Sequence, residues 1–193
     1  IVNAINLIDG LDGLASLVSI KFLIVTGGII LVNYSELFLF FPIIIGGLLG
    51  FLLHNFSSTK KVFLGDTGSL FIGTTMAFFI IFILDGNSQI ITDKYISRPL
   101  MCVLILLYPL TDTLRAIILR SYKNQSPFVA DRIHLHHRLA DKGYEHWAAS
   151  SIIFLISGLI LFINFLLFQY IGLIPCIALT LVLMNIFYYI LFK

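Results

Sequence analysis

Six long apolar stretches, separated by short polar segments, dominate the chain. Each is close to the about twenty mostly apolar residues that an α-helix needs to cross the hydrocarbon core of a bilayer. Polar and turn-forming residues interrupt the pattern at 33–36, 85–88 and 170–175. We therefore predict an all-α polytopic membrane protein with about six transmembrane helices, in one transmembrane domain over residues 1–193. The predicted spans are residues 14–32, 37–55, 67–84, 98–119, 147–168 and 171–192.

The polar segments differ in charge, and this difference predicts the orientation of the helices. Six crossings place the N-terminal residues, residues 54–66, residues 121–146 and the C-terminus on one side. The lysines and arginines of that side are Lys60, Lys61, Arg115, Arg120, Lys123, Arg132, Arg138, Lys142 and Lys193, whereas the opposite loops hold only Lys94 and Arg98. Because basic loops face the cytoplasm, we expect this side to be cytoplasmic. Lys21, inside the first span, is expected to snorkel toward it.

Composition supports a membrane protein and excludes other classes. Hydrophobic residues make up 59% of the chain and charged residues 11%, with a mean hydropathy of +1.03, whereas soluble proteins carry about 25% charged residues. The formal net charge of +2 is too small to predict a nucleic-acid partner. Cys102 and Cys176 lie in apolar runs, so neither a disulfide framework nor a zinc site is predicted.

The first polar motif occupies the start of the chain, IVNAINLIDGLDGL. Asn3, Asn6, Asp9 and Asp12 recur at every third position, so consecutive members share a face of a helical turn. A glycine follows each aspartate and allows the backbone to approach a ligand closely. Two amides and two carboxylates beside a membrane-type sequence predict a site for a hard cation and a polar substrate.

A second motif, GDTGS at residues 65–69, lies where a loop enters a helix. Asp66 and its neighbours are ordinary helix-capping residues, and capping alone is one interpretation. The other is that Asp66 ligates a metal while backbone N–H groups at the helix start favour an anion. Mg²⁺ takes one or two protein oxygens and completes its octahedron with water and substrate phosphate, which suits Asn6 together with Asp66.

Two further clusters each have two interpretations. Asp112 and Arg115, three residues apart, either form a structural ion pair or hold neighbouring active-site loops. Residues 131–138, DRIHLHHR, lack familiar zinc ligand spacing, and Arg132 and Arg138 would repel a dication. Such a basic loop attracts anionic lipid or, in the interpretation that we favour, clamps a diphosphate with arginine and imidazole donors.

All these clusters fall on one predicted face of the membrane. His54 and His146, isolated at helix ends, are interpreted as interface residues. A transporter would more often carry ionisable groups through the middle of its helices, but the predicted helix centres are apolar. The pattern favours a surface site that serves a cytoplasmic substrate.

These clusters strongly resemble the motifs of the polyprenyl-phosphate N-acetylhexosamine-1-phosphate transferases, which form glycosyltransferase family 4. The matching words, in the family's order, are NAINLIDGLDGLA at residues 3–15, FLGDTGSLFIG at 63–73, PLTDTLR at 109–115 and SPFVADRIHLHHRLADKG at 126–143. Residues 131–138, which we call the histidine loop, are similar to the HIHH form of the GlcNAc-type branch, with Leu135 in place of the usual isoleucine.

The resemblance implies roles for the first motif and its surroundings. Asn6 and Asp66 match the family's Mg²⁺ ligands, with Mn²⁺ as a second candidate cofactor. Asp12 matches the position that contacts the uracil base, and Asp9 matches a polar position of the nucleotide pocket. Asn55 matches an asparagine that precedes the GD motif, which is Gly65-Asp66 in this chain. The spacing from Asn55 to Asp66 is one residue longer here than in the family.

The remaining candidates belong to the start of the chain and to the histidine loop. Asn3 is grouped with the substrate-binding residues without a firm role. His134, His136, His137 and Arg132 match the catalytic loop that closes over the diphosphate and the amino sugar.

The implied reaction is transfer of N-acetylhexosamine-1-phosphate, most simply GlcNAc-1-phosphate, from a UDP-sugar to undecaprenyl or another polyprenyl phosphate. UMP is released, and the product initiates cell-envelope polysaccharide synthesis. The expected partners are the UDP-N-acetylhexosamine, the polyprenyl phosphate, membrane lipid and a second copy in a homodimer. The expected location is the bacterial cytoplasmic (inner) membrane.

The family carries further transmembrane helices upstream of the first motif, with an adjacent aspartate pair and a lysine near the phosphates. This chain begins within the motif. We therefore expect an N-terminally truncated piece, the C-terminal part of a larger multi-spanning enzyme, that is inactive alone. The alternative is a non-catalytic remnant or a lipid-linked-sugar binding protein without the aspartate pair.

Overall fold

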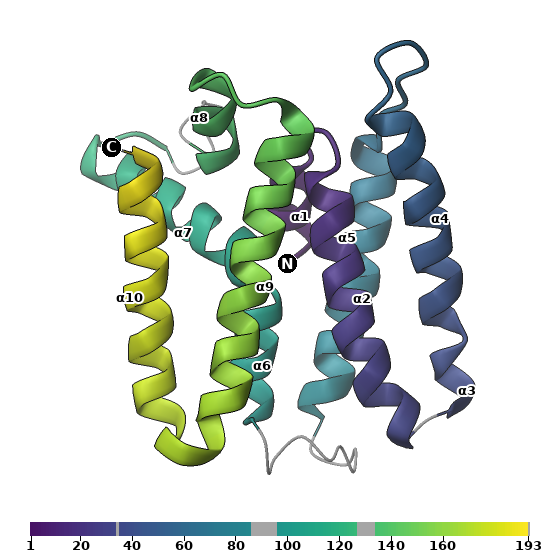
Figure 1. Cartoon of the computed structure of the whole chain (residues 1–193), viewed down its shortest axis with the longest axis vertical. Helices are drawn as coiled ribbons and strands as arrows, with labels where there is room; N and C mark the ends of the chain where they lie inside the picture. The colour runs from purple at the N-terminus through teal and green to yellow at the C-terminus, as the bar shows by residue number, and fades with distance from the viewer. Residues whose placement is uncertain (34, 86–95, 127–133, 193) are drawn as a thin grey trace.

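The computed structural model describes residues 1–33, 35–85, 96–126 and 134–192, and this part of the chain is built from α-helices without a strand (Figure 1). The prediction of an all-α polytopic membrane protein is confirmed. The helices are α1 (Val2–Ile8), α2 (Leu14–Asn33), α3 (Ser35–Phe38), α4 (Phe40–Asn55), α5 (Gly65–Leu84), α6 (Arg98–Ile105), α7 (Leu107–Tyr122), α8 (Leu135–Asp141), α9 (His146–Ile171) and α10 (Leu173–Phe192).

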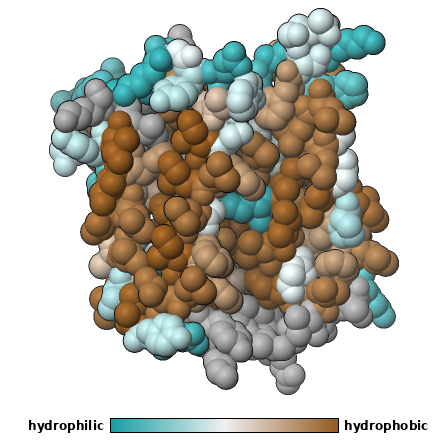
Figure 2. Space-filling view, in the orientation of Figure 1, coloured by the Kyte–Doolittle hydropathy of each residue, from teal (hydrophilic) through white to brown (hydrophobic). Residues whose placement is uncertain are grey.

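Five stretches of the described chain are long and apolar enough to cross a membrane, and they correspond to five of the predicted spans. Their outward faces are apolar: Ile43 of α4 is 73% exposed and Ile174 of α10 is 79% exposed. Figure 2 shows hydrophobic side chains as a broad band, with hydrophilic residues above it. Apolar surface of this extent fits lipid rather than water. The five spans are Leu14–Leu31, Glu36–Asn55, Gly65–Leu84, His146–Ile171 and Leu173–Ile190.

The sixth predicted span is broken. α6 and α7 meet at Leu106, and the two helices are bent by 75° relative to each other. The continuous helix predicted over residues 98–119 is therefore wrong at this point. Pro109 supplies the reason, because in a continuous helix its ring would clash with the carbonyl of Ile105 and it has no N–H to donate there. In the first turn of α7 the missing N–H leaves no hydrogen bond unmade.

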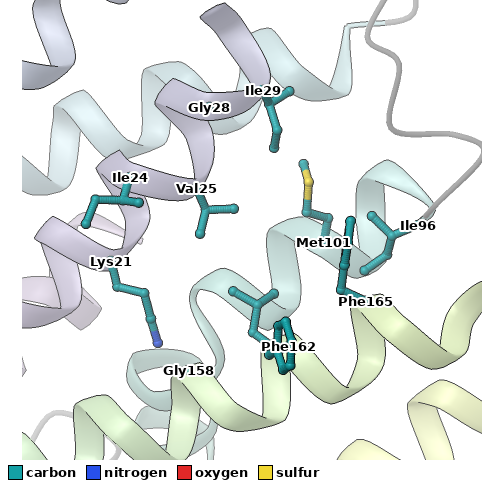
Figure 3. Close-up of a pocket in the computed structure, with 11 residues that line it drawn as sticks. Lys21, Ile24, Val25, Gly28, Ile29, Ile96, Met101, Gly158, Phe162 and Phe165 are labelled. Carbon is teal, nitrogen blue, oxygen red and sulfur yellow. The ribbon is translucent and has the colours of Figure 1, made fainter. Parts of the chain in front are cut away.

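Lys21 does not snorkel. Its side chain is buried between α2 and α9, and its Nζ donates a hydrogen bond to Ser157 Oγ at 2.7 Å. The prediction was wrong because α9 packs against α2 and offers a hydroxyl at this level. Lys21 also lines a cavity of about 500 Å³ between α2, α6 and α9, in which every other lining residue is apolar or glycine (Figure 3). No polar residue of the sequence motifs lines this cavity.

The short helix α1 lies among the longer helices and packs against α5 and α7. At Gly73 of α5, a Cβ atom would lie 3.0 Å from the Cα atom of Val2. Glycine at this position therefore lets α1 lie close to α5. After Ile8 the chain turns into α2 at the end of the bundle that also carries α8 and the start of α9 (Figure 1).

Candidate active site

Residues 9–13 form a tight turn between α1 and α2. Gly13 has a φ of +74°, which L side chains rarely adopt, and a Cβ atom here would overlap the ring of Phe56. Gly10 also has a close neighbour, because a Cβ atom there would lie 3.3 Å from His136 Nε2. The two glycines therefore let the turn pack between the end of α4 and the histidine loop.

The first and second motifs meet at the start of α5. Asn6 Nδ2 donates hydrogen bonds to Asp66 Oδ1 at 3.0 Å and to Ser69 Oγ at 2.9 Å. Gly65 begins α5 with a φ of +66°, and Ser69 Oγ donates to its carbonyl at 3.0 Å. Residues 60 positions apart in the chain thus lie in direct contact.

Three carboxylates gather around this contact. Burial raises the pKa of Asp9 to about 6; the backbone N–H of Gly65 opposes the shift, and the charges of Asp66 and Asp12 add to it. A carboxylate with this pKa is half ionised near pH 6 and mostly ionised at pH 7. Asp9, Asp12 and Asp66 therefore share one electrostatic site, in which a cation would relieve their repulsion.

The donor set fits a magnesium ion that shares its coordination with water and substrate. The described residues contain no group of three His, Cys, Asp or Glu side chains arranged around one metal position. Mg²⁺ does not require such a cage, because one or two protein oxygens suffice when phosphate and water supply the rest. Asn6 and Asp66 are the amide and carboxylate that lie in contact here.

Asp12 is held from two sides. Its Oδ2 accepts a hydrogen bond from Lys61 Nζ at 2.6 Å and lies 2.7 Å from His146 Nδ1. Its backbone carbonyl accepts from Ser150 Oγ at 2.6 Å. Lys61 comes from the segment between α4 and α5, whereas His146 and Ser150 come from the first turns of α9. The interpretation of His146 as an interface residue missed this contact.

Asp112 of α7 anchors the start of the histidine loop. Its Oδ2 lies 2.8 Å from His134 Nδ1, and its Oδ1 accepts from the backbone N–H of Leu135 at 3.0 Å. Arg115 Nη2 donates to the same Oδ1 at 3.3 Å. Both interpretations of Asp112 from the sequence are therefore correct: it forms the ion pair with Arg115, and it holds a neighbouring loop.

His136 is fully buried and carries no charge at neutral pH. Burial lowers its pKa to about 3. Its Nδ1 lies 3.1 Å from the Tyr108 hydroxyl, and its Nε2 is buried without a hydrogen-bond partner among the described residues. His137 is half-buried and lies beside both His136 and Gly10, with the two imidazole centroids 4.3 Å apart. Arg132 lies outside the described residues.

The two remaining asparagines differ in their surroundings. Asn55 is buried at the end of α4, and its Nδ2 donates to the carbonyl of Val62 at 2.7 Å. It therefore holds the segment that carries Lys61. Asn3 is exposed on α1 and makes no side-chain hydrogen bond to another described residue.

The structure thus brings Asn6, Asp9, Asp12 and Asp66 together at one end of the bundle, with His136 and His137 against the same turn. The sequence interpretation did not identify Lys61, Ser150 or Tyr108 as neighbours of these residues. Lys61 stands five positions before Asp66, which is a local signal. Ser150 and Tyr108 lie in long helices and have no such signal, because only tertiary packing brings them to the site.

Comparisons with known proteins agree with this grouping of motifs. The profile of glycosyl transferase family 4 matches residues 1–84. The chain is 37% identical over 180 residues to a decaprenyl-phosphate N-acetylglucosaminephosphotransferase of Mycolicibacterium smegmatis, with 84% of the chain and 43% of the relative covered. It is 39% identical over 163 residues to a probable undecaprenyl-phosphate N-acetylglucosaminyl 1-phosphate transferase of Bacillus subtilis, with 81% and 42% covered.

A more distant relative is the undecaprenyl-phosphate α-N-acetylglucosaminyl 1-phosphate transferase of Escherichia coli K12. It is 29% identical over 163 residues, with 82% of the chain and 43% of the relative covered. The chain therefore spans about two-fifths of the length of these relatives. No solved structure matches the chain significantly.

Proposed function

Because the chain belongs to glycosyl transferase family 4, we propose that it transfers N-acetylhexosamine-1-phosphate from a UDP-sugar to polyprenyl phosphate, with release of UMP. GlcNAc-1-phosphate is the first candidate for the transferred group, since the relatives' names specify N-acetylglucosamine. The relatives are also named for decaprenyl or undecaprenyl phosphate, which supports a long polyprenyl phosphate as the acceptor. The product would initiate synthesis of a cell-envelope polysaccharide.

The observation that carries the proposal is the meeting of separate motifs at one end of an apolar bundle. Asn6 contacts Asp66, Asp9 and Asp12 lie in the same electrostatic site, and His136 packs on Gly10. Such a site borders water on one side and lipid on the other. A water-soluble nucleotide sugar and a lipid acceptor can meet at this boundary, but neither phase alone holds both.

In the proposed reaction, a phosphate oxygen of the polyprenyl phosphate attacks the β-phosphorus of the UDP-sugar, which carries the sugar. A new P–O bond forms, and the bond from the β-phosphorus to the bridging oxygen breaks. The bridging oxygen keeps the bonding electrons and leaves as part of UMP. Catalysis then depends on positioning the two phosphates and on stabilising the negative charge that is transferred.

Asn6 and Asp66 would hold Mg²⁺, or Mn²⁺ in its place. The bound ion would offset negative charge on the diphosphate and on the leaving oxygen. The support is the direct contact between the two side chains, within a group of three carboxylates. Burial raises the pKa of Asp9 in this group, and the charges of Asp66 and Asp12 add to the shift. We assign Asp9 to the nucleotide pocket and Asp12 to the uracil base, with the exposed Asn3 as a peripheral residue.

The histidine loop would divide its roles between positioning and phosphate contact. His134 and His136 are buried and engaged with Asp112 and Tyr108 of α7, so we assign them to positioning the loop. His137 is half-buried beside Gly10 and is assigned to the diphosphate. Arg132 is assigned to the same contact because a guanidinium matches phosphate oxygens.

We assign the polar end of the bundle to the cytoplasmic side of the bacterial inner membrane. Lys60, Lys61, Arg138 and Lys142 belong to segments at this end, as the positive-inside rule requires for a cytoplasmic face. The nucleotide sugar would approach from that side, and the apolar band of Figure 2 would lie in the bilayer.

Measured UMP release tests this function. The whole protein in lipid nanodiscs should release UMP from UDP-GlcNAc only when undecaprenyl phosphate and Mg²⁺ are both present. Asp66→Asn should reduce turnover at least about a hundredfold while the protein remains folded, because changing even the outer partners of metal ligands costs about 10- to 100-fold and a direct ligand should matter at least as much. Glu36→Gln, an exposed carboxylate change at the other end of the bundle, is the matched control and should retain turnover.

Two results would contradict the proposal. UMP release that is independent of the lipid acceptor would indicate hydrolysis rather than transfer. Wild-type turnover in the Asp66→Asn variant would remove Asp66 from the metal site. A panel of UDP-sugars in the same assay identifies the donor.

A further inference from the structure

The cavity between α2, α6 and α9 has one polar side chain in an apolar wall. Its volume is about 500 Å³, and among the described residues that line it only Lys21 is polar. Figure 3 shows Lys21 reaching from α2 toward Gly158 of α9, at one end of the space that Phe162 and Phe165 border. A cavity of this size, with apolar walls and a single orienting polar group, is typical of a site for a small ligand.

Lys21 is buried, but its hydrogen bonding is incomplete. Only 5% of the residue is exposed, and Ser157 is its only hydrogen-bond partner within the described part of the chain. The Ser157 hydroxyl accepts from Nζ at 2.7 Å and donates its own hydrogen to the carbonyl of Phe154 at 3.2 Å. Because an ammonium group has three N–H donors, two of them lack an acceptor. No carboxylate of the described residues balances the charge.

The depth of Lys21 in the membrane makes this arrangement costly. Lys21 follows Leu14, the first residue of its span, by seven positions. It therefore lies about 10 Å along the helix from the start of the apolar segment. Charged side chains inside a membrane span are rare, pair with another group and mark functional sites. Since Ser157 is neutral, the partner that Lys21 lacks is an anion.

We propose that the cavity binds a single-chain lipid carboxylate, the chemical class of the long-chain fatty acids. The carboxylate would accept from the two remaining N–H groups of Lys21, in charge-assisted hydrogen bonds that are stronger than neutral ones. The hydrocarbon chain would lie along Phe162 and Phe165. Ile24 and Phe165, which line the cavity, are 57% and 45% exposed, so a ligand can enter from the lipid phase.

The donors and the walls of the cavity favour this ligand over other lipids. The two oxygens of a carboxylate match the two unused donors of Lys21. A phospholipid would bring further phosphate, glycerol and ester oxygens into walls that hold no other donor, and buried polar groups without partners disfavour binding. An uncharged hydrocarbon would leave the ammonium group unpaired. The site goes beyond the proposed transfer reaction, because it shares no residue with the candidate active site.

Photolabelling of the whole protein in phosphatidylcholine nanodiscs tests the site. The probe is palmitate that carries a photoreactive diazirine in its chain. After irradiation, peptide mass spectrometry should find the label on α9 and α6, and excess unlabelled palmitate should remove it. Methyl palmitate has the same chain without the charge. It should compete at least about tenfold less well, because it loses a hydrogen bond between charged groups.

Two kinds of variant separate the charge from the space. Lys21→Met should reduce labelling at least about tenfold, whereas Lys21→Arg should retain most of it. Gly158→Phe keeps Lys21 but fills the cavity, and it should also lose the label. A Cβ atom at Gly158 meets no atom within 4 Å, so this variant should fold, which thermal unfolding verifies. Gly47→Phe, at an equally open glycine of α4, is the matched control and should label like wild type.

Three outcomes would overturn the inference. A wild-type protein without label on α9 and α6 would show that another part of the protein or a tightly held lipid fills the cavity. Equal labelling of Lys21→Met and wild type would remove the role of the charge. Equal competition by phosphatidylglycerol or undecaprenyl phosphate would assign the site to a lipid phosphate. UMP release tests the proposed function separately from all three.

Discussion

Asp112 is completely buried, yet its two carboxylate oxygens form hydrogen bonds with three groups of the protein. They are the His134 imidazole, the backbone N–H of Leu135 and the Arg115 guanidinium. A buried charge is tolerated only when it is paired and hydrogen-bonded in this way. Since two of the three partners lie at the start of α8, this single side chain ties the histidine loop to α7.

Replacing Asp112 should release that loop. Asp112→Ala removes an acceptor and leaves the Arg115 charge without this partner, so we expect a loss of about 3 to 5 kcal/mol in the free energy of unfolding. Hydrogen exchange at residues 134–143 should accelerate more than exchange in α5. Asp141→Asn, an exposed change in the same region, is the control. Unchanged exchange at the loop in Asp112→Ala would show that the anchor has no such role.

Asp9 should give the protein a characteristic dependence of stability on pH. Its folded pKa of about 6 lies above the ordinary value of 3.8. The unfolded chain therefore loses this proton first, and ionising Asp9 destabilises the fold as pH rises from about 4 to about 6, with a constant effect above that. Asp9→Asn should be more stable than wild type at pH 7, and the difference should disappear below about pH 4.

Thermal unfolding in detergent without divalent cations measures this effect across the pH range. The comparison variant is Glu36→Gln, whose effect on the unfolding temperature should be small at every pH. A difference between Asp9→Asn and wild type that does not change with pH would contradict the raised pKa.

At the level of helices, hydrophobic length predicted five spans correctly and one incompletely. Length and apolarity are local properties, so the sequence displays them directly. The break at Leu106 was signalled by Pro109, but the 75° bend depends on what α7 packs against after the break. α7 turns toward α10, where Thr111 Oγ1 and the Tyr188 hydroxyl lie 3.3 Å apart. The sequence does not show that contact, because it joins residues far apart in the chain.

The hydrogen bond between Lys21 and Ser157 also joins two helices, α2 and α9. Ser157→Ala removes the acceptor of a buried ammonium group, and we expect a loss of about 1 to 3 kcal/mol in the free energy of unfolding. Lys21→Met in the Ser157→Ala background should recover most of that loss, because it removes the unsatisfied charge. Unfolding in a detergent titration measures both. Ser121→Ala, an exposed serine near the end of α7, is the control. Equal stability of Ser157→Ala and wild type would contradict the role of this bond.

For the whole molecule, the sequence predicted which residue types form the site but only part of their arrangement. The spacing of Asn6, Asp9 and Asp12 placed them on neighbouring turns, and the GD motif singled out Asp66. The contact from Asp12 to His146 joins residues 134 positions apart, and it exists only because α9 packs beside α2. Tertiary packing of this kind has no periodic signature, so the cluster around Asp12 emerged only from the structure.

Isotopic labelling of the donor shows whether a sugar phosphate, and not the sugar alone, moves to the lipid. UDP-GlcNAc labelled with ³²P at the β-phosphorus is incubated with the whole protein, undecaprenyl phosphate and Mg²⁺, and the lipid extract is counted against the UMP released. We expect one labelled phosphate in the lipid for each UMP formed, with unlabelled UMP in the water phase. Labelled UDP in the water phase with an unlabelled lipid product would show transfer of the sugar alone and would contradict the proposed reaction.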